Sequence, residues 1–296
     1  MKNSEKTDKI GLIYALSAFV LWGFLVVFFK QFEGVNPYEI VAHRILWSVI
    51  VLFILLAWLG RLKSVRANLL NFRVSFWLFV SGFALALSWC IFVYAVDNDL
   101  VLEASLGNFI SPIFSILIGY FILKEQLSFG AKISFFIVMI AIGIQVVAVG
   151  TLPILAISLA AIVSVYALIR KKVKIGALEG LFIENLLISP IGIAYIFYLI
   201  SVGDNHFNLD KNGMLLILCG PVTIVPLLFF TAATKLISLS TIGYTQYINP
   251  SISMLLAIFV YNESIATYKL VSFCLIWLAL FVVSAYGIYT YKKDHR

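Results

Sequence analysis

Four polar or aromatic side chains lie within one apolar stretch near the start of the sequence: Glu39, His43, Arg44 and Trp47. On a helix, Glu39 and His43 are four residues apart and share one face, whereas Arg44 points about 100° away from His43. Arg44 lies roughly 10 Å from Pro37 along the helix axis, deeper than Glu39. Ionisable groups at membrane depth are costly and usually functional. Glu39 and Arg44 are therefore candidates for functional charges inside the membrane, with solvation of Glu39 at the surface as the alternative.

An acidic residue in the second half of the chain could neutralise Arg44. Glu184 lies 140 residues after Arg44 in a similar apolar stretch, and opposite charges at matching positions could pair across an interface. The alternative is that each side chain extends to its own membrane surface. Glu103 is a further candidate for an intramembrane charge. It opens another apolar stretch, where a carboxylate would stabilise a helix N-terminus.

Two prolines, Pro112 and Pro250, each follow an amide residue by four positions. A proline inside a helix removes one backbone hydrogen bond and clashes with the carbonyl four residues earlier, which here belongs to Asn108 or to Gln246. In lipid, a freed carbonyl is tolerated only inside protein or beside a wet cavity. Each proline predicts a helix kink, either satisfied by neighbouring helices or lining a path for a solute.

Aromatic residues surround this candidate path. Tyr244 and Tyr247 flank Gln246, and His43 and Trp47 are candidates for the facing wall. An aromatic cage could be drawn from a larger set: Trp22, Trp89, Tyr94, Tyr166, Tyr244 and Tyr247. In a chain with 15% aromatic residues, packing is the expected role of most of them.

The amino-acid composition indicates that lipid surrounds much of this protein. Of the 296 residues, 62% are hydrophobic and 12% are charged, whereas soluble domains carry roughly 25% charged residues. The net charge of +7 does not indicate nucleic-acid binding, because the basic residues fall in short gaps between apolar runs. Cys90, Cys219 and Cys274 lie inside those runs without metal-ligand spacing. We expect membrane lipid around the chain, and neither a metal nor a cofactor.

Ten apolar runs are long enough to cross a bilayer. They are Ile10–Phe29, Pro37–Leu59, Val74–Val96, Leu102–Leu123, Gly130–Val149, Pro153–Ile169, Gly180–Leu199, Met214–Leu236, Thr241–Val260 and Leu270–Tyr289. With the N-terminus inside, most Lys and Arg residues fall in inner segments, and only Lys30, Lys211 and Lys269 fall in outer loops. The sequence therefore predicts that both termini are cytoplasmic.

The two halves of the chain resemble each other. At an offset of 138, the segment 108–125 matches 246–263 in its rare residues, including Pro112 with Pro250 and Glu125 with Glu263. An offset of 140 lays Glu39 on Glu179. Five helices is an odd number, so the second half enters the membrane from the opposite side. The prediction is an all-α integral membrane protein with ten transmembrane helices as two inverted five-helix repeats, residues 1–150 and 151–296.

Several functional classes were weighed. A secondary transporter fits inverted repeats. An integral membrane enzyme would need signatures such as HExxH or GxSxG, which the sequence lacks, so we expect a non-enzyme. A sensor or channel without transport activity is the other alternative, but the sequence contains no filter-like TVGYG loop. A P-loop is also absent. Coupling to an ion such as a proton is left open.

Several segments resemble a known family nearly end to end. They are FVLWGF, EIVAHRILWS, LEASLGNFISP, LPILAISLA, YALIRKK and STIGYTQYINP. The chain resembles the drug/metabolite transporter superfamily, and more narrowly the RarD-type permeases of the EamA family. The resemblance implies a multi-pass protein of the bacterial inner membrane that moves a small organic solute by alternating access. That solute could be a metabolite, an amino acid or a drug such as chloramphenicol.

Overall fold

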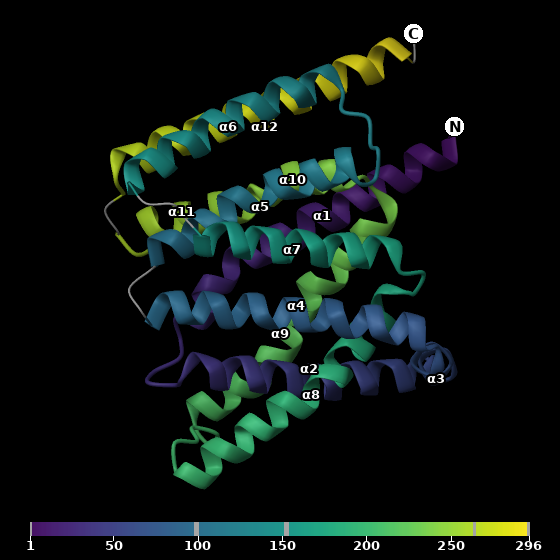
Figure 1. Ribbon diagram of the computed structural model, residues 1–296, viewed down its shortest axis with the longest axis vertical. Coiled ribbons are helices and arrows are strands. Elements are labelled where there is room, and N and C mark those ends of the chain that lie inside the picture. Colours follow the sequence, from purple (N-terminus) through teal and green to yellow (C-terminus); the bar gives the residue numbers. More distant parts are fainter. Residues whose placement is uncertain (1, 98–100, 151–153, 263–264, 295–296) are drawn as a thin grey trace.

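The computed structural model describes residues 2–97, 101–150, 154–262 and 265–294, and every regular element in these ranges is a helix (Figure 1). The helices are α1 (Lys2–Phe29), α2 (Pro37–Trp58), α3 (Leu62–Leu70), α4 (Phe72–Asp97), α5 (Val101–Phe121), α6 (Phe129–Val149), α7 (Ile154–Lys172), α8 (Ala177–Val202), α9 (Lys211–Leu236), α10 (Leu239–Gln246), α11 (Ile248–Phe259) and α12 (Thr267–Asp294).

Lipid explains why the apolar runs fold as helices, because a helix satisfies its backbone hydrogen bonds within one segment. Within the described ranges, eight helices are long and apolar enough to cross a membrane: α1, α2, α4, α6, α7, α8, α9 and α12. Helix α5 and the pair α10–α11 cover the two other predicted spans. The chain is an all-helical integral membrane protein, as its composition predicts.

A proline accounts for the predicted span that is divided in two. The run Thr241–Val260 forms α10 and α11, which meet at Tyr247. Pro250 has no N–H with which to bond the carbonyl of Gln246, the last residue of α10. Pro112, by contrast, lies inside the continuous helix α5.

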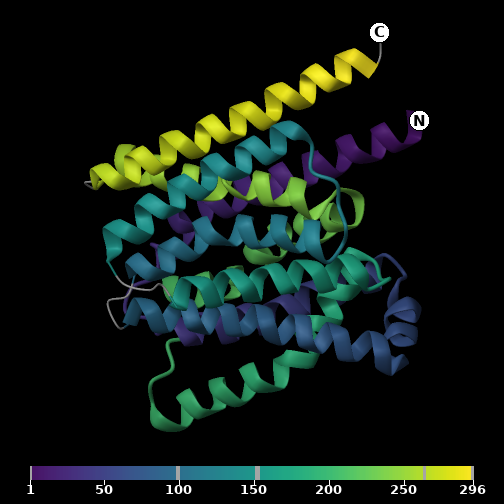
Figure 2. The same cartoon turned by 45° about the horizontal axis from the view of Figure 1, so that its top comes forward.

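The main helix contacts form a pattern that is the same for both halves of the chain. Helices at equivalent positions pack on each other in three pairs, α2 with α8, α5 with α10 and α6 with α12. The other large contacts come as twins: α5–α7 with α1–α11, α4–α7 with α1–α9, and α2–α9 with α4–α8. Figures 1 and 2 both place α6 and α12 at one edge of the molecule and α8 at the opposite edge.

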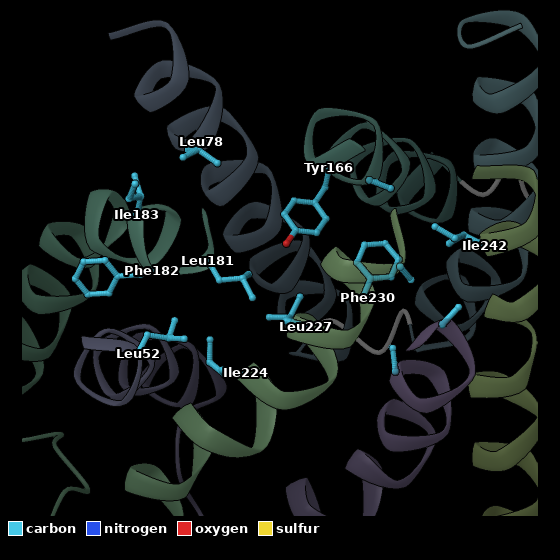
Figure 3. Close-up of a cluster of buried hydrophobic side chains, with 14 of the residues drawn as sticks. Leu52, Leu78, Tyr166, Leu181, Phe182, Ile183, Ile224, Leu227, Phe230 and Ile242 are labelled. Atoms are coloured by element: carbon cyan, nitrogen blue, oxygen red, sulfur yellow. The ribbon is translucent and has the colours of Figure 1, made fainter. Parts of the chain in front are cut away.

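Both chain ends lie at the same end of the helix set, which also carries α3 (Figure 1). The largest apolar core lies between the halves, where Leu52 and Leu78 meet Leu181, Leu227 and other buried side chains (Figure 3). Many large apolar side chains elsewhere point outward, such as those of α12. This arrangement suits a protein whose outer surface contacts lipid tails.

Candidate functional site

A buried ion pair joins the last turn of α7 to α8. Arg170 Nη1 lies 3.3 Å from Glu184 Oε1, and both side chains are at least 98% buried. Ser81 of α4 donates a hydrogen bond to the same carboxylate oxygen. Gly180 makes room for the pair, because a Cβ at that position would overlap the Arg170 guanidinium.

Arg44 of α2 lines the same region and, among the residues that the structure describes, forms no ion pair of its own. Its guanidinium carbon lies 4.7 Å above the ring of Trp89 on α4, a cation–π arrangement. Electrostatic interactions connect Tyr166 of α7 with Arg44, Arg170 and Glu184. We call Arg44, Ser81, Tyr166, Arg170 and Glu184 the central polar cluster.

The structure corrects the predicted ion pair between Arg44 and Glu184. Glu184 pairs with Arg170 instead, because the short connection between α7 and α8 holds Arg170 beside the first turns of α8. The alternative, in which each charge reaches its own membrane surface, is also wrong. Arg44 is 5% exposed and Glu184 is 2% exposed.

A pocket opens between α2, α4 and α8 at this cluster. Both Arg44 and Glu184 line it, so the two residues do face one space. Its walls are formed by Arg44, Ile45, Gly82, Leu85, Ala86, Glu184, Asn185 and Ile188. Gly82 allows the close approach of α4 and α8, since a Cβ there would lie 3.0 Å from the backbone oxygen of Glu184.

Glu39 closes one end of α2 instead of being solvated there. Its side chain is fully buried and accepts hydrogen bonds from the backbone N–H of His206, at 2.8 Å, and from its ring Nδ1, at 2.9 Å. His43 Nε2 is 3.9 Å from the same carboxylate, as the shared helix face predicts. The His43 ring stacks on Phe207 with centroids 5.0 Å apart, and Trp47 lies 6.1 Å from Phe207.

A surface ion pair lies beside these contacts between α2 and the α8–α9 connection. Lys211 Nζ lies 2.7 Å from Glu33 Oε1, which joins the α1–α2 connection to the start of α9. The hydrogen bond and the positive charge of Lys211 lower the pKa of Glu33. The α8–α9 connection is thus held to α2 and to the residues before it.

The equivalent glutamate of the second half, Glu179, holds the opposite end. Its Oε1 lies 3.4 Å from Arg61 Nη1, in the connection that follows α2. The contact is looser than that of Glu39, because the Arg61 side chain is 55% exposed. Glu125 at the same end accepts hydrogen bonds from the backbone N–H groups of Leu239 and Ser240 and so caps α10.

The predicted path between the spans at Asn108 and Gln246 is a polar packing interface in the structure. Gln246 is 8% exposed, and its Oε1 accepts a hydrogen bond from Ser115 at 3.3 Å. Ser164 of α7 donates to the carbonyl of Ser111, beside Pro112. The Asn108 side chain is exposed.

The two tyrosines of this region also bond to backbone carbonyls. Tyr247 is fully buried and donates to Phe109 at 3.1 Å, and Tyr244 donates to Ala131 at 2.5 Å. The structure therefore brings Gln246, Tyr244 and Tyr247 to the first half, but it brings His43 and Trp47 to Phe207. The predicted site residues therefore form two separate groups and do not line opposite sides of one path.

The aromatic candidates do not form one cage either. Trp22 and Tyr166 both pack on Phe230, at centroid distances of 5.4 and 6.1 Å, as Figure 3 shows for Tyr166. Trp89 lies under Arg44, and Tyr94 is half exposed. The Glu103 side chain lies outside the described part of the chain, so its predicted role at a helix N-terminus stays a prediction.

Sequence reasoning missed Arg170, Asn185, His206 and Phe207. Arg170 stands next to Lys171 and Lys172, and this run was interpreted as a signal for membrane orientation alone. The available signal was spacing: Arg170 follows Tyr166 by four residues and so shares its helix face. His206 and Phe207 lie in a connection, where no periodic pattern indicates which residues turn inward.

A helical membrane protein with a buried ionic cluster between its halves is the class defined by this fold and site. The family model described as the EamA-like transporter family matches residues 9–147 and 151–285. This chain belongs to that family, and its relatives make it a RarD-type member.

Three relatives illustrate the similarity. An "Uncharacterized transporter" of Vibrio cholerae is 36% identical, over 97% of this chain and 96% of that protein. "Protein RarD" of Escherichia coli is 34% identical over 98% and 99%. A "Chloramphenicol-sensitive protein RarD" of Pseudomonas aeruginosa is 23% identical over 97% of each. A crystal structure covering 92% of this chain and 96% of its own has a TM-score of 0.71 at 18% identity, which supports the fold alone.

Proposed function

We propose that this chain is a secondary transporter that moves a small organic solute across a bacterial cytoplasmic membrane by alternating access. The solute would be a metabolite, an amino acid or a drug. The observation that carries the proposal is the twinned helix packing, in which α2, α5 and α6 each contact their own counterpart in the second half. Inverted repeats that pack in this way hold their substrate between the halves.

The proposed architecture has ten spans, with α5 and the pair α10–α11 as the fourth and ninth. The family model matches each half separately, which supports two repeats over residues 1–150 and 151–296. In an inverted repeat the two halves cross the membrane in opposite directions. The end of a helix that faces one side therefore corresponds to the end of its counterpart that faces the other side. Both termini would be cytoplasmic, because that orientation puts most of the basic residues inside.

The paired glutamates support alternating access. Glu39 holds the connection after α8, and Glu179 holds the connection after α2, so matched residues act at opposite ends. An alternating-access protein needs one closure at each end, released in turn. The end at Glu39 is the tighter in this structure, since Glu39 is fully buried whereas Arg61 is largely exposed.

The pocket between α2, α4 and α8 is our first candidate for the solute site, because two of its lining residues, Arg44 and Glu184, each have a buried polar atom without a hydrogen bond. The interface of α5 with α10, at Asn108, Gln246, Tyr244 and Tyr247, is the second candidate. It is favoured less because Gln246 and both tyrosines already have partners. Flux measurements on Asn108→Ala, Gln246→Ala and Tyr247→Ala test this second site.

Topology is tested by single cysteines in a background without native ones. Cysteines placed in 61–73 should react with impermeant reagents from the cytoplasm, and those in 204–212 from the exterior. Labelling of both segments from one side would contradict the inverted halves. Purified protein in liposomes should then carry radiolabelled solutes, whereas turnover of a solute without translocation would favour the alternative of a membrane enzyme.

A further inference from the structure

Arg44 is a buried cation without an anionic partner. Its residue is 5% exposed, and in the described part of the chain no carboxylate lies within ion-pair distance and no side chain or carbonyl accepts a hydrogen bond from it. Its contact with the Trp89 ring covers one flat face of the guanidinium. Buried charges are normally paired, because desolvation of an ion is costly.

The surrounding charges increase the positive potential. Glu184 is engaged by Arg170 and Ser81, so it cannot serve Arg44 fully. Lys235 of α9 interacts electrostatically with both Arg170 and Glu184 and contributes a further positive charge. Within the described residues, two arginines therefore accompany one carboxylate in the central polar cluster, and Arg44 is the cation of this cluster that lines the pocket.

The pocket walls indicate what would neutralise this charge. Beside Arg44, the lining is mainly aliphatic, with Ile45, Leu85 and Ile188. A planar guanidinium presents a fork of N–H donors that matches the two oxygens of a carboxylate. With one face on Trp89, the edge of that fork is still available. In this conformation the pocket has about 10 Å³ of free space, about enough for one water molecule, so a carboxylate with a short apolar body fits beside Arg44 once the surrounding helices move apart.

We propose that Arg44 binds the carboxylate of a small organic acid in the pocket between α2, α4 and α8, and that such acids are the solutes carried. The inference rests on the proposed transport function for its second half. The Asn185 amide nitrogen donates to the carbonyl of Leu181 at 2.8 Å, which leaves its oxygen as an acceptor for a hydroxyl or amine on the ligand.

The first experiment needs no variant. Purified full-length protein in detergent is titrated with propionate, isovalerate and benzoate, and in parallel with propionamide, isovaleramide and benzamide, while thermal unfolding is followed. At least one carboxylate should raise the unfolding temperature, whereas its carboxamide, of nearly equal shape, should not. Equal effects of a carboxylate and its amide, or no effect of any of the six compounds, would overturn the proposal.

The second experiment removes the charge. In Arg44→Gln, the affinity for the active carboxylate should fall by about 10- to 100-fold, and Arg44→Lys should fall between this variant and the wild type because it keeps the charge but not the fork. Arg66→Gln is the matched control, since Arg66 is exposed on α3. Undiminished binding in Arg44→Gln, or displacement by chloride at equal concentration, would overturn a carboxylate site.

Flux in liposomes separates the inference from the function on which it rests. If carboxylates bind through Arg44 but protein-dependent flux of every tested solute is absent, the site stands and the transport function fails. If neutral solutes are carried at the same rate by wild type and Arg44→Gln, and carboxylates are not bound, transport stands and the site fails. Arg44-dependent flux of the bound acid supports both.

Discussion

Buried polar groups gather in two regions of the helix bundle, and the regions differ in whether these groups have hydrogen-bond partners. At the interface of α5 with α10, Gln246, Tyr244 and Tyr247 each have a hydrogen-bond partner on the other half. In the central polar cluster, which includes the pocket of α2, α4 and α8, polar atoms of Arg44, Tyr166, Arg170 and Glu184 are buried without a hydrogen bond. Both regions are rich in polar residues, so polarity alone does not distinguish packing from binding.

Whether the buried polar atoms have hydrogen-bond partners is therefore more informative than how many polar residues a region contains. A hydrogen-bonded polar contact between membrane helices stabilises the fold and needs no ligand. A buried polar group without a partner lowers stability, so it is retained where something else uses it. The comparison predicts that changes at the α5–α10 interface alter stability, whereas Arg44 alters binding.

The largest effect should come from the Arg170–Glu184 pair. Glu184→Ala leaves a buried guanidinium without its carboxylate and should lower the free energy of unfolding by about 3–5 kcal/mol. The double variant Arg170→Met with Glu184→Ala should lose less than the sum of the singles. Thermal unfolding in detergent measures both. Additive losses would show that the two charges do not act as a pair.

Arg44→Gln combined with Glu184→Ala is the matched comparison. Arg44 and Glu184 form no ion pair in the structure but share one pocket and the neighbour Tyr166, so their coupling should be weaker than that of Arg170 with Glu184. If the stability loss of the double variant differed strongly from the sum of the two single losses, the result would support the ion pair between Arg44 and Glu184 that the sequence predicted.

A smaller effect is expected from Gly243→Ala in α10. A Cβ at Gly243 would lie 2.7 Å from the carbonyl oxygen of Pro112 and 2.8 Å from Ile116, and backbone cannot move aside cheaply. The loss of stability should be about 1–3 kcal/mol. Gly143→Ala on α6 is the control, because no atom lies within 4 Å of its Cβ position. If the two variants were equally stable, α5 and α10 would not pack this closely.

Tyr247→Phe should have a modest effect on stability and none on flux. It removes the hydroxyl that donates to the Phe109 carbonyl, and such bonds in membranes contribute about 0.6 kcal/mol on average. Tyr198→Phe is the control, since Tyr198 is 57% exposed. A marked fall in flux with unchanged stability would move the solute path back to α5 and α10.

The smallest change in stability is expected for Arg44→Gln, the variant with the largest change in binding. Removal of a desolvated charge offsets the lost contact with Trp89, so the unfolding temperature without ligand should be equal to or above that of the wild type. A drop comparable to that of Glu184→Ala would show that Arg44 is chiefly structural, and the contrast between the two regions would disappear.

The class of protein and most of its helices can be predicted from the order of residues alone. Charge-poor apolar runs are readable without a structure because lipid imposes one simple requirement on each segment. The sequence predicted a kink at both Pro112 and Pro250, because a proline removes a hydrogen bond of its own helix. The structure divides the span before Pro250 but keeps α5 continuous through Pro112. The correspondence of Glu39 in the first half with Glu179 in the second, 140 residues later, was also visible in the sequence.

Which polar residues contact each other depends instead on how the helices pack. Glu184 was expected to pair with Arg44, but the packing of α7 on α4 and beside α8 brings Arg170 to it instead. Helix periodicity fixes the direction of a side chain but not the neighbour in that direction. The neighbour depends on helix positions set by small contacts, such as the space that Gly180 leaves for Arg170. Partners in ion pairs are therefore a property of the packed bundle.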